Sequence, residues 1–292
     1  SGKNIYIDFD GVYMNSEVYI NGKLLGKRPY GYISFRYDMT PYIKFGSNNN
    51  ILVKVDNLEQ PNSRWYSGCG IYRNVWLVKS HKIHIDHWGV FVSSTIDKNG
   101  NANVQVQTSL ENGEKGAKKI TVLSSILDKD GKEVANVETA RGRVIGKDTV
   151  TQSCVIKNPN LWSTDNPYMY TLKSSILLGG EKIDEVTTPL GVRSFNFDAQ
   201  KGFFLNGKGM KINGVCLHHD LGCLGAAVNK VAIERQLKLL KDMGCNAVRM
   251  SHNPPSIEIL DLCDEMGLLV MDEAFDMWRR KKTKHDYARY FD

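Results

Sequence analysis

Near residue 200 the period of the apolar residues changes, and this change limits the folds that the chain can adopt. Upstream, short apolar runs alternate with polar residues, as they do in half-buried β-strands. Downstream, "NKVAIERQLKLLKDMG" places Ile233, Leu237, Leu240 and Met243 at helical spacing. The sequence therefore predicts β domains followed by a segment that mixes strands with helices.

The downstream segment has the pattern strand, helix, strand, helix, strand. We expect strands at "MKINGVCL", "CNAVRM" and "LLVMDE", and a second helix at "PPSIEILDLCDEMG". Asn229 can cap the start of the first helix, while Gly244 and Gly267 can end the two helices. Because helical crossovers join parallel strands, the pattern predicts a parallel sheet. The third strand is apolar without alternation, which predicts burial of both its faces.

The upstream part is expected to form two β domains. Residues 1–80 hold five short alternating runs separated by turn residues, a pattern typical of a jelly roll. Residues 81–192 continue with hairpin-type turns at "DKNGN" and "DKDGK", and their length suits a seven-stranded immunoglobulin-like sandwich. We therefore predict domains at 1–80, 81–192 and 193–292.

Composition and charge exclude several classes of partner. The net charge of +6 is modest, and the basic run "RRKKTK" is not repeated with interleaved aromatic residues, so no nucleic acid partner is predicted. No apolar stretch approaches the ~20 residues of a membrane-spanning helix. The six cysteines show neither a CxxC pair nor a zinc-finger spacing. We expect free buried thiols, with Cys216, Cys245 and Cys263 in apolar contexts.

Polar clusters follow all three predicted strands of the downstream segment. The carboxyl ends of parallel strands meet at one edge of a sheet, where such folds bind their ligands. Carboxylates, imidazoles and an arginine without a phosphate loop suit a polyhydroxylated ligand, and a tryptophan after an acidic strand end suits stacking on a sugar ring. The clusters are His218, His219 and Asp220; Arg249, Ser251, His252 and Asn253; and Asp272, Glu273, Asp276 and Trp278.

Several of these residues can also have structural roles. His252 can cap the second helix, and Trp278 can belong to the core. His218 and His219 are adjacent in a strand, so only one of them can face the site. Arg249 lies between Val248 and Met250, so it can face the site, pair with Asp272 or Glu273, or do both.

Other folds and chemistries remain as alternatives. A doubly wound nucleotide fold would place GxGxxG after the first strand, and "LGCLGAA" lacks that spacing, so we favour the start of a (β/α)8 barrel. A metal-dependent hydrolase would use His218, Asp220, His252 and Asp272. A non-catalytic carbohydrate-binding or scaffold protein would fit residues 1–192 alone.

Five stretches of the chain resemble glycoside hydrolase family 2, the β-galactosidase and β-glucuronidase group of bacteria. They are "GVYMNSEVYINGKLLGKRPYGY", "NSRWYSGCGIYRNVWL", "GVCLHHD", "CNAVRMSHNP" and "LLVMDEAFDMW". The resemblance implies a jelly roll, an immunoglobulin-like sandwich and the first part of a (β/α)8 TIM barrel. It also implies a retaining exo-β-glycosidase, most similar to a β-galactosidase, with β-glucuronidase or β-mannosidase specificity as the alternative.

The resemblance assigns roles to individual residues. His218, Arg249 and His252 match positions that contact the sugar or shape its subsite, and Arg64 and Trp65 lie where the jelly roll reaches toward the active site. Cys216 stands where an asparagine is usual. Glu273 matches an acidic position that holds magnesium in some members. The second ligand in those members is a histidine shortly after the glutamate, and "AFDMW" stands there instead, so magnesium is possible but not predicted, and no other cofactor is expected.

The resemblance further implies that this chain is an internal fragment. The acid/base and nucleophile glutamates are expected beyond Asp292, so no catalytic residue is predicted here and the chain alone is expected to be inactive. The substrate is expected to be a β-glycoside or oligosaccharide. Whether the parent is a homo-oligomer, and whether it is periplasmic or cytoplasmic, stays open.

Overall fold

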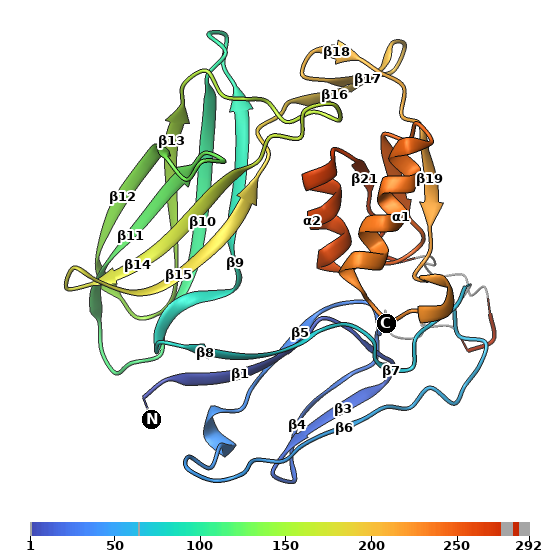
Figure 1. The fold of residues 1–292 in the computed structure, drawn as a ribbon. Helices are drawn as coiled ribbons and strands as arrows, with labels where there is room; N and C mark the ends of the chain where they lie inside the picture. The colour runs from blue at the N-terminus through green and yellow to red at the C-terminus, as the bar shows by residue number, and fades with distance from the viewer. Residues whose placement is uncertain (1, 64, 276–282, 286–292) are drawn as a thin grey trace. The chain divides into compact units, whose positions relative to one another are not determined.

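A computed structural model describes residues 2–63, 65–275 and 283–285 (Figure 1). Arg64, Asp276 and Trp278, three of the predicted site residues, lie outside the described residues. The chain forms two compact units. One comprises Lys3–Lys79 together with the chain from Asn213 onward, and the other comprises Ser80–Ile212, so the second is inserted into the sequence of the first. None of the described helices is long and apolar enough to cross a membrane.

The N-terminal part of the first unit is a β-sandwich of short strands. Alternating residues of β1 and β3 point into one core, where they meet Phe35 and Met39. The strands pair in the orders β5-β1-β8, β4-β3-β6 and β2-β7. They are β1 (Asn4–Phe9), β2 (Val12–Tyr13), β3 (Ser16–Ile20), β4 (Lys23–Arg28), β5 (Phe35–Asp38), β6 (Ile51–Lys54), β7 (Gly70–Ile71) and β8 (Val75–Ser80), with a 3₁₀ turn η1 (Thr40–Tyr42).

The five predicted runs contain β1, β3, β5, β6 and β8, and the fifth also includes the end of β7, whereas β2 and β4 were not predicted. The longer of these two is β4. Its sequence "KLLGKR" does not alternate, and none of its residues is buried. It is held by pairing with β3 across the turn at Asn21 and Gly22, so it depends on its neighbour more than on its own pattern.

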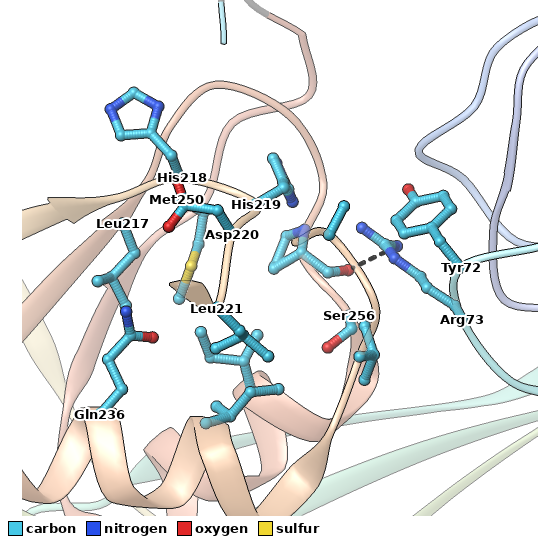
Figure 2. A pocket seen from close by; sticks show the side chains of 15 residues that line it. Tyr72, Arg73, Leu217, His218, His219, Asp220, Leu221, Gln236, Met250 and Ser256 are labelled. Carbon is cyan, nitrogen blue, oxygen red and sulfur yellow. Dashed lines mark hydrogen bonds between the residues drawn. The ribbon is translucent and has the colours of Figure 1, made fainter. Parts of the chain in front are cut away.

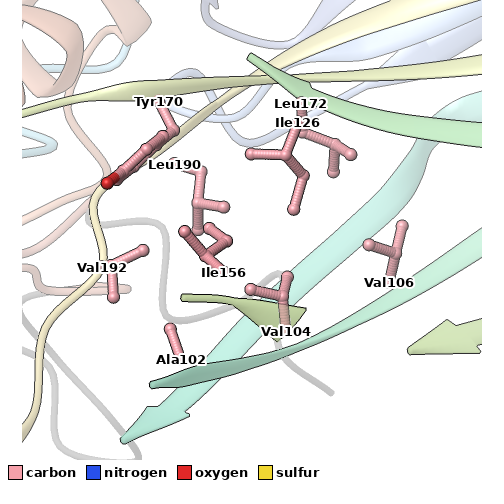
Figure 3. Packing of buried hydrophobic residues seen from close by; sticks show 9 residues of the cluster. All are labelled: Ala102, Val104, Val106, Ile126, Ile156, Tyr170, Leu172, Leu190 and Val192. Atoms are coloured by element: carbon pink, nitrogen blue, oxygen red, sulfur yellow. The ribbon is translucent and has the colours of Figure 1, made fainter. Parts of the chain in front are cut away.

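The second unit contains the immunoglobulin-like sandwich, and its seven strands confirm the predicted number. Sheets β13-β10-β9 and β12-β11-β14-β15 pack around a core of alternating apolar residues, part of which Figure 3 shows. Both predicted turns close as expected, with Gly100 N–H donating to Asp97 and Gly131 N–H to Asp128. The strands are β9 (Ile83–Ile96), β10 (Ala102–Asn112), β11 (Lys118–Leu127), β12 (Glu133–Val144), β13 (Gly146–Ile156), β14 (Tyr170–Leu178) and β15 (Glu181–Leu190).

A small antiparallel sheet follows the sandwich within the second unit. It consists of β16 (Phe195–Asp198), β17 (Gly202–Leu205) and β18 (Lys208–Gly209). The chain then returns to the first unit.

The remaining part confirms the predicted alternation of strands and helices. Strands β19 (Gly214–Leu217), β20 (Ala247–Met250) and β21 (Leu269–Met271) form a parallel sheet in that order. The crossovers contain α1 (Lys230–Asp242) and α2 (Ile257–Met266). Both helices pack their apolar faces on Val248 and Met250, so they cover one face of the sheet. The opposite face carries Arg249.

The predicted helix ends are also correct. The Asn229 side chain accepts a hydrogen bond from the Ala232 backbone N–H, which satisfies one donor of the first turn. Gly244 follows α1 with φ of 94°, and Gly267 ends α2 with φ of 75°, a conformation that glycine adopts without steric cost.

One prediction for this sheet is wrong. The apolar run of β21 was expected to be buried on both faces, but Leu269 and Val270 are only half-buried and Met271 is 57% exposed. These residues are less buried because β21 is an edge strand of the described sheet, in which it pairs only with β20. A continuous apolar run therefore indicates a strand but does not by itself give its burial here.

Candidate functional site

An arginine, a glutamate and a histidine form a hydrogen-bonded network at the carboxyl ends of β20 and β21. Arg249 Nε lies 2.6 Å from Glu273 Oε1, and Arg249 Nη2 lies 2.5 Å from the same oxygen. His252 Nδ1 lies 2.8 Å from the other oxygen, Glu273 Oε2. Both carboxylate oxygens are thus engaged, each by a different strand-end residue. Of the two partners predicted for Arg249, the structure selects Glu273.

Strand alternation explains why Arg249 reaches this network. Its neighbours Val248 and Met250 are 1% and 2% exposed against the helices, so the arginine side chain must point to the other face. On that face it stands in register with Cys216 of β19 and Met271 of β21. Its Nη1 lies 3.6 Å from the Cys216 sulfur. Cys216 was expected to be buried but is exposed, because it lies on the same face as Arg249, whereas Cys263 is buried as predicted.

The network determines the charge of Glu273. Partial burial raises the pKa of this carboxyl, but the hydrogen bonds and positive charge of Arg249, together with the hydrogen bond from His252, outweigh burial and hold the pKa below its usual range. Glu273 is therefore ionised at neutral pH. An ionised carboxylate with both oxygens occupied can accept and orient hydrogen bonds, but it is poorly suited to donating a proton.

A row of rings stands beside this network. The Trp65 indole stacks on the His218 imidazole with centroids 4.4 Å apart, and His218 meets His252 edge-on at 5.5 Å. Trp65 Nε1 donates to Asp220 Oδ2 at 2.6 Å, which fixes the tilt of the indole. Trp65 nevertheless stays 50% exposed, so one side of its ring can contact a ligand.

The predicted site residues are brought together to different degrees. The structure gathers His218, Arg249, His252, Glu273 and Trp65 through the contacts above. Asn253 is buried beneath them, with its Oδ1 2.7 Å from the Tyr30 hydroxyl. Asp272 neighbours Glu273 in the chain. The residue is exposed, but its carboxyl has lost part of its contact with water, and this desolvation raises the pKa of that group.

Two residues that contact the site from the N-terminal sandwich were not predicted. Tyr30 reaches Asn253 and the carbonyl of Ala274, and Arg73 donates to the carbonyls of Pro254 at 2.8 Å and Pro255 at 3.1 Å. Both are buried. Nothing in the local pattern around either residue indicates a contact with a segment some 180 residues or more away.

The two adjacent histidines point in different directions, as predicted. His218 belongs to the row of rings, whereas His219 packs on Tyr32 with centroids 4.9 Å apart. Both border a small pocket of about 50 Å³ between the end of β19 and the two helices, into which Figure 2 looks. In that view the His218 ring points away from Leu221 and Gln236. The pocket lies on the helix side, and neither Arg249 nor Glu273 lines it.

His219 should make the stability of the protein depend on pH. Burial, followed by the positive charge of Arg73, lowers the pKa of its imidazole to about 3, against 6.5 for a free histidine. In the unfolded chain this imidazole binds a proton below about pH 6.5, whereas in the folded protein it stays neutral down to about pH 3. The free energy of unfolding therefore falls as the pH drops from about 6.5 to about 3.

Between pH 7 and pH 4.5 the free energy of unfolding should fall by about 2 kcal/mol less in His219→Gln than in the wild type. Urea unfolding of both proteins at the two pH values measures this. Parallel pH dependence in the wild type and His219→Gln would contradict the assignment.

The surroundings of Glu273 do not favour a magnesium ion. The negative charge of its carboxylate is already paired with the Arg249 guanidinium at Oε1, and His252 bonds to Oε2, so a second cation would have to compete with the arginine. Within residues 2–63, 65–275 and 283–285, no three His, Cys, Asp or Glu side chains gather as a metal site would require. The described geometry thus lends no support to the metal-dependent alternative.

Three models of one family match the chain in sequence order. The sugar binding domain of glycosyl hydrolases family 2 matches residues 1–81, a central model of the same family matches residues 83–193, and its TIM barrel domain matches residues 198–280. Together they cover nearly the whole chain.

Individual relatives agree with these matches. The Beta-galactosidase BoGH2A of Bacteroides ovatus is 58% identical over 100% of this chain, which covers 34% of that protein. A Beta-glucuronidase of Bacteroides fragilis is 33% identical over 93% of this chain, which covers 41% of it. A solved structure of a glycosyl hydrolase family 2 member from Bacteroides cellulosilyticus superposes with a TM-score of 0.96 at 43% identity, covering 100% of this chain and 38% of that chain. The chain thus spans between a third and two fifths of the length of these relatives.

Proposed function

This chain belongs to glycosyl hydrolases family 2, and from that premise we propose that the whole protein hydrolyses terminal β-glycosidic bonds. By the whole protein we mean the full-length gene product that contains this sequence. The chain contains the family's sugar-binding jelly roll, its immunoglobulin-like domain and the start of its TIM barrel. We place the domain boundaries at 80/81 and 192/193.

The observation that carries the proposal is the Arg249–Glu273–His252 network beside an exposed tryptophan. A sugar ring offers an apolar face for stacking and hydroxyls that both donate and accept hydrogen bonds. Trp65 supplies the flat surface, while the network supplies fixed donors and acceptors next to it. We assign sugar binding to this surface, with His218, Asn253 and Asp272 beside it and Arg64, Asp276 and Trp278 as further members outside the described residues.

We propose a retaining mechanism in which Glu273 is not one of the two catalytic carboxyl groups. Retaining enzymes need a nucleophile and an acid/base roughly 5–5.5 Å apart across the scissile bond. Glu273 is held ionised, so it suits positioning of the substrate and stabilisation of positive charge. The family resemblance assigns the catalytic glutamates to positions after Asp292, in the whole protein. No metal or cofactor enters this proposal.

A β-galactoside is the substrate that we favour over a β-glucuronide. A glucuronide carries a carboxylate, which needs a cationic partner in the sugar subsite. The charge of Arg249 is neutralised by Glu273, so this arginine is suited to a neutral hexoside. The 58% identity to a protein named as a β-galactosidase points in the same direction.

A panel of nitrophenyl glycosides tests this proposal on the whole protein. We expect kcat/KM for the β-galactoside to exceed that for the β-glucuronide and β-mannoside by at least ~10-fold. Preference for the glucuronide would support the alternative specificity. Binding of galactose without turnover of any glycoside would support a carbohydrate-binding protein instead.

A further inference from the structure

One tyrosine of the N-terminal sandwich touches both loops that carry the network. The Tyr30 hydroxyl lies 2.7 Å from Asn253 Oδ1 and 2.9 Å from the Ala274 carbonyl oxygen. Asn253 directly follows His252, and Ala274 directly follows Glu273. The Tyr30 hydroxyl thus contacts the residue after His252 and the residue after Glu273. His252 and Glu273 are themselves hydrogen-bonded to each other.

The position of this hydroxyl is fixed by packing. Tyr30 is 8% exposed and belongs to a tyrosine cluster composed of Tyr13, Tyr30, Tyr32 and Tyr72 with Met14. The rings of Tyr30 and Tyr32 lie 5.6 Å apart, and Phe275 packs against the cluster from the second loop. The ring of a tyrosine side chain is oriented by two torsion angles, so a packed ring leaves its hydroxyl oxygen little freedom.

Arg73 strengthens the same connection on the first loop. Its guanidinium donates to the carbonyls of Pro254 and Pro255, just after Asn253, and also to the carbonyl of Tyr32 in the tyrosine cluster. The loop after β20 is therefore held on the sandwich at three consecutive residues. The loop after β21 is held by the Ala274 carbonyl, so the Tyr30 hydroxyl contacts both loops.

We propose that Tyr30 is a positioning residue that sets the geometry of the His252–Glu273 pair in the sugar subsite. It touches neither the substrate nor the reacting atoms. It acts by fixing the backbone on either side of the pair, so that the carboxylate is held where both Arg249 and His252 reach it. The inference rests on the proposed function for its kinetic consequence, but its structural consequence is independent of activity.

Tyr30→Phe removes the hydroxyl and keeps the ring, so the cluster stays packed. The matched control is Tyr13→Phe, because the Tyr13 hydroxyl is also buried and also donates to an asparagine Oδ1 at 2.7 Å, that of Asn62 within the sandwich. If Tyr30 only helped to hold the cluster together, both variants would behave alike.

We expect Tyr30→Phe to lower kcat/KM of the whole protein roughly fivefold, because misplaced substrate contacts reduce transition-state binding. Tyr13→Phe should stay within about twofold of the wild type. Hydrogen exchange measured by mass spectrometry should be faster in Tyr30→Phe over 251–256 and over 272–275, and unchanged there in Tyr13→Phe. The acid-side fall of kcat/KM should also begin at higher pH in Tyr30→Phe, since a looser pair lets the pKa of Glu273 rise toward its usual value.

The outcomes separate this inference from the proposed function. Equal effects in both variants, or wild-type exchange in both loops of Tyr30→Phe, would overturn the positioning role. A wild-type protein that cleaves no glycoside would overturn the proposed function. In that case the exchange experiment alone decides the role of Tyr30.

Discussion

Arg249→Ala in the whole protein should lower kcat/KM by at least ~10-fold on its preferred glycoside. The substitution removes the guanidinium that lies 2.6 Å from Glu273 and that registers with Cys216 across the sheet. Among the residues that the structure describes, Glu273 would then keep His252 as its one side-chain partner, so both its position and its charge would change. Because the network is expected to bind the sugar in the transition state, kcat should fall together with kcat/KM.

Arg36→Ala provides a matched control for this experiment. Arg36 forms a two-point pair with Asp8 at 2.6 and 2.7 Å inside the N-terminal sandwich, so its loss tests the general effect of breaking such a pair. It should alter thermal stability while leaving kcat/KM near the wild-type value. Near-wild-type kinetics in a folded Arg249→Ala protein would remove Arg249 from the sugar subsite.

The 292-residue chain by itself is expected to turn over nitrophenyl β-galactoside at least ~10³-fold more slowly than the whole protein. Retention needs a nucleophile and a proton donor on opposite sides of the bond. Glu273 is held ionised by its partners, and Asp220 accepts a hydrogen bond from Trp65. Neither is placed as a proton donor, so the chain should bind sugar without cleaving it.

Purified chain and whole protein, assayed side by side at equal concentration, check this expectation. Turnover by the chain near the rate of the whole protein would refute it. Glu273→Gln and Asp272→Asn then identify the residue responsible. Asp272 is the acid to test first, because partial desolvation raises the pKa of its carboxyl.

Local patterns predicted much of this fold. The spacing of Ile233 and Leu237 gave the buried face of α1, and Asn229 and Gly267 gave helix ends that the structure contains. These features succeed because they depend on residues within one or two turns. The gathering of Arg249, His252 and Glu273 was also predictable, since parallel strands bring their carboxyl ends to one edge.

Features set by distant partners could not be predicted in this way. The exposure of Met271 depends on which strand lies beside β21, and β4 depends on its hairpin with β3. Tyr30 and Arg73 sit in sequence surroundings that indicate only a β domain. Their contacts with residues 253–255 depend on tertiary packing, which the local spacing of apolar residues does not indicate.

The insertion of one unit into the sequence of the other has a consequence for synthesis on the ribosome. The Tyr30–Asn253 hydrogen bond joins residues 223 positions apart, and the intervening Ser80–Ile212 forms a unit of its own. At about 5–20 residues per second, the two partners emerge on the order of ten seconds apart or more. During this delay the inserted sandwich can fold, while the partners of Tyr30 and Trp65, which are Asn253 and Asp220, have not yet been synthesised. A ribosome that stalls within the insertion therefore leaves a half-formed unit whose uncovered aromatic residues invite aggregation and recruit chaperones.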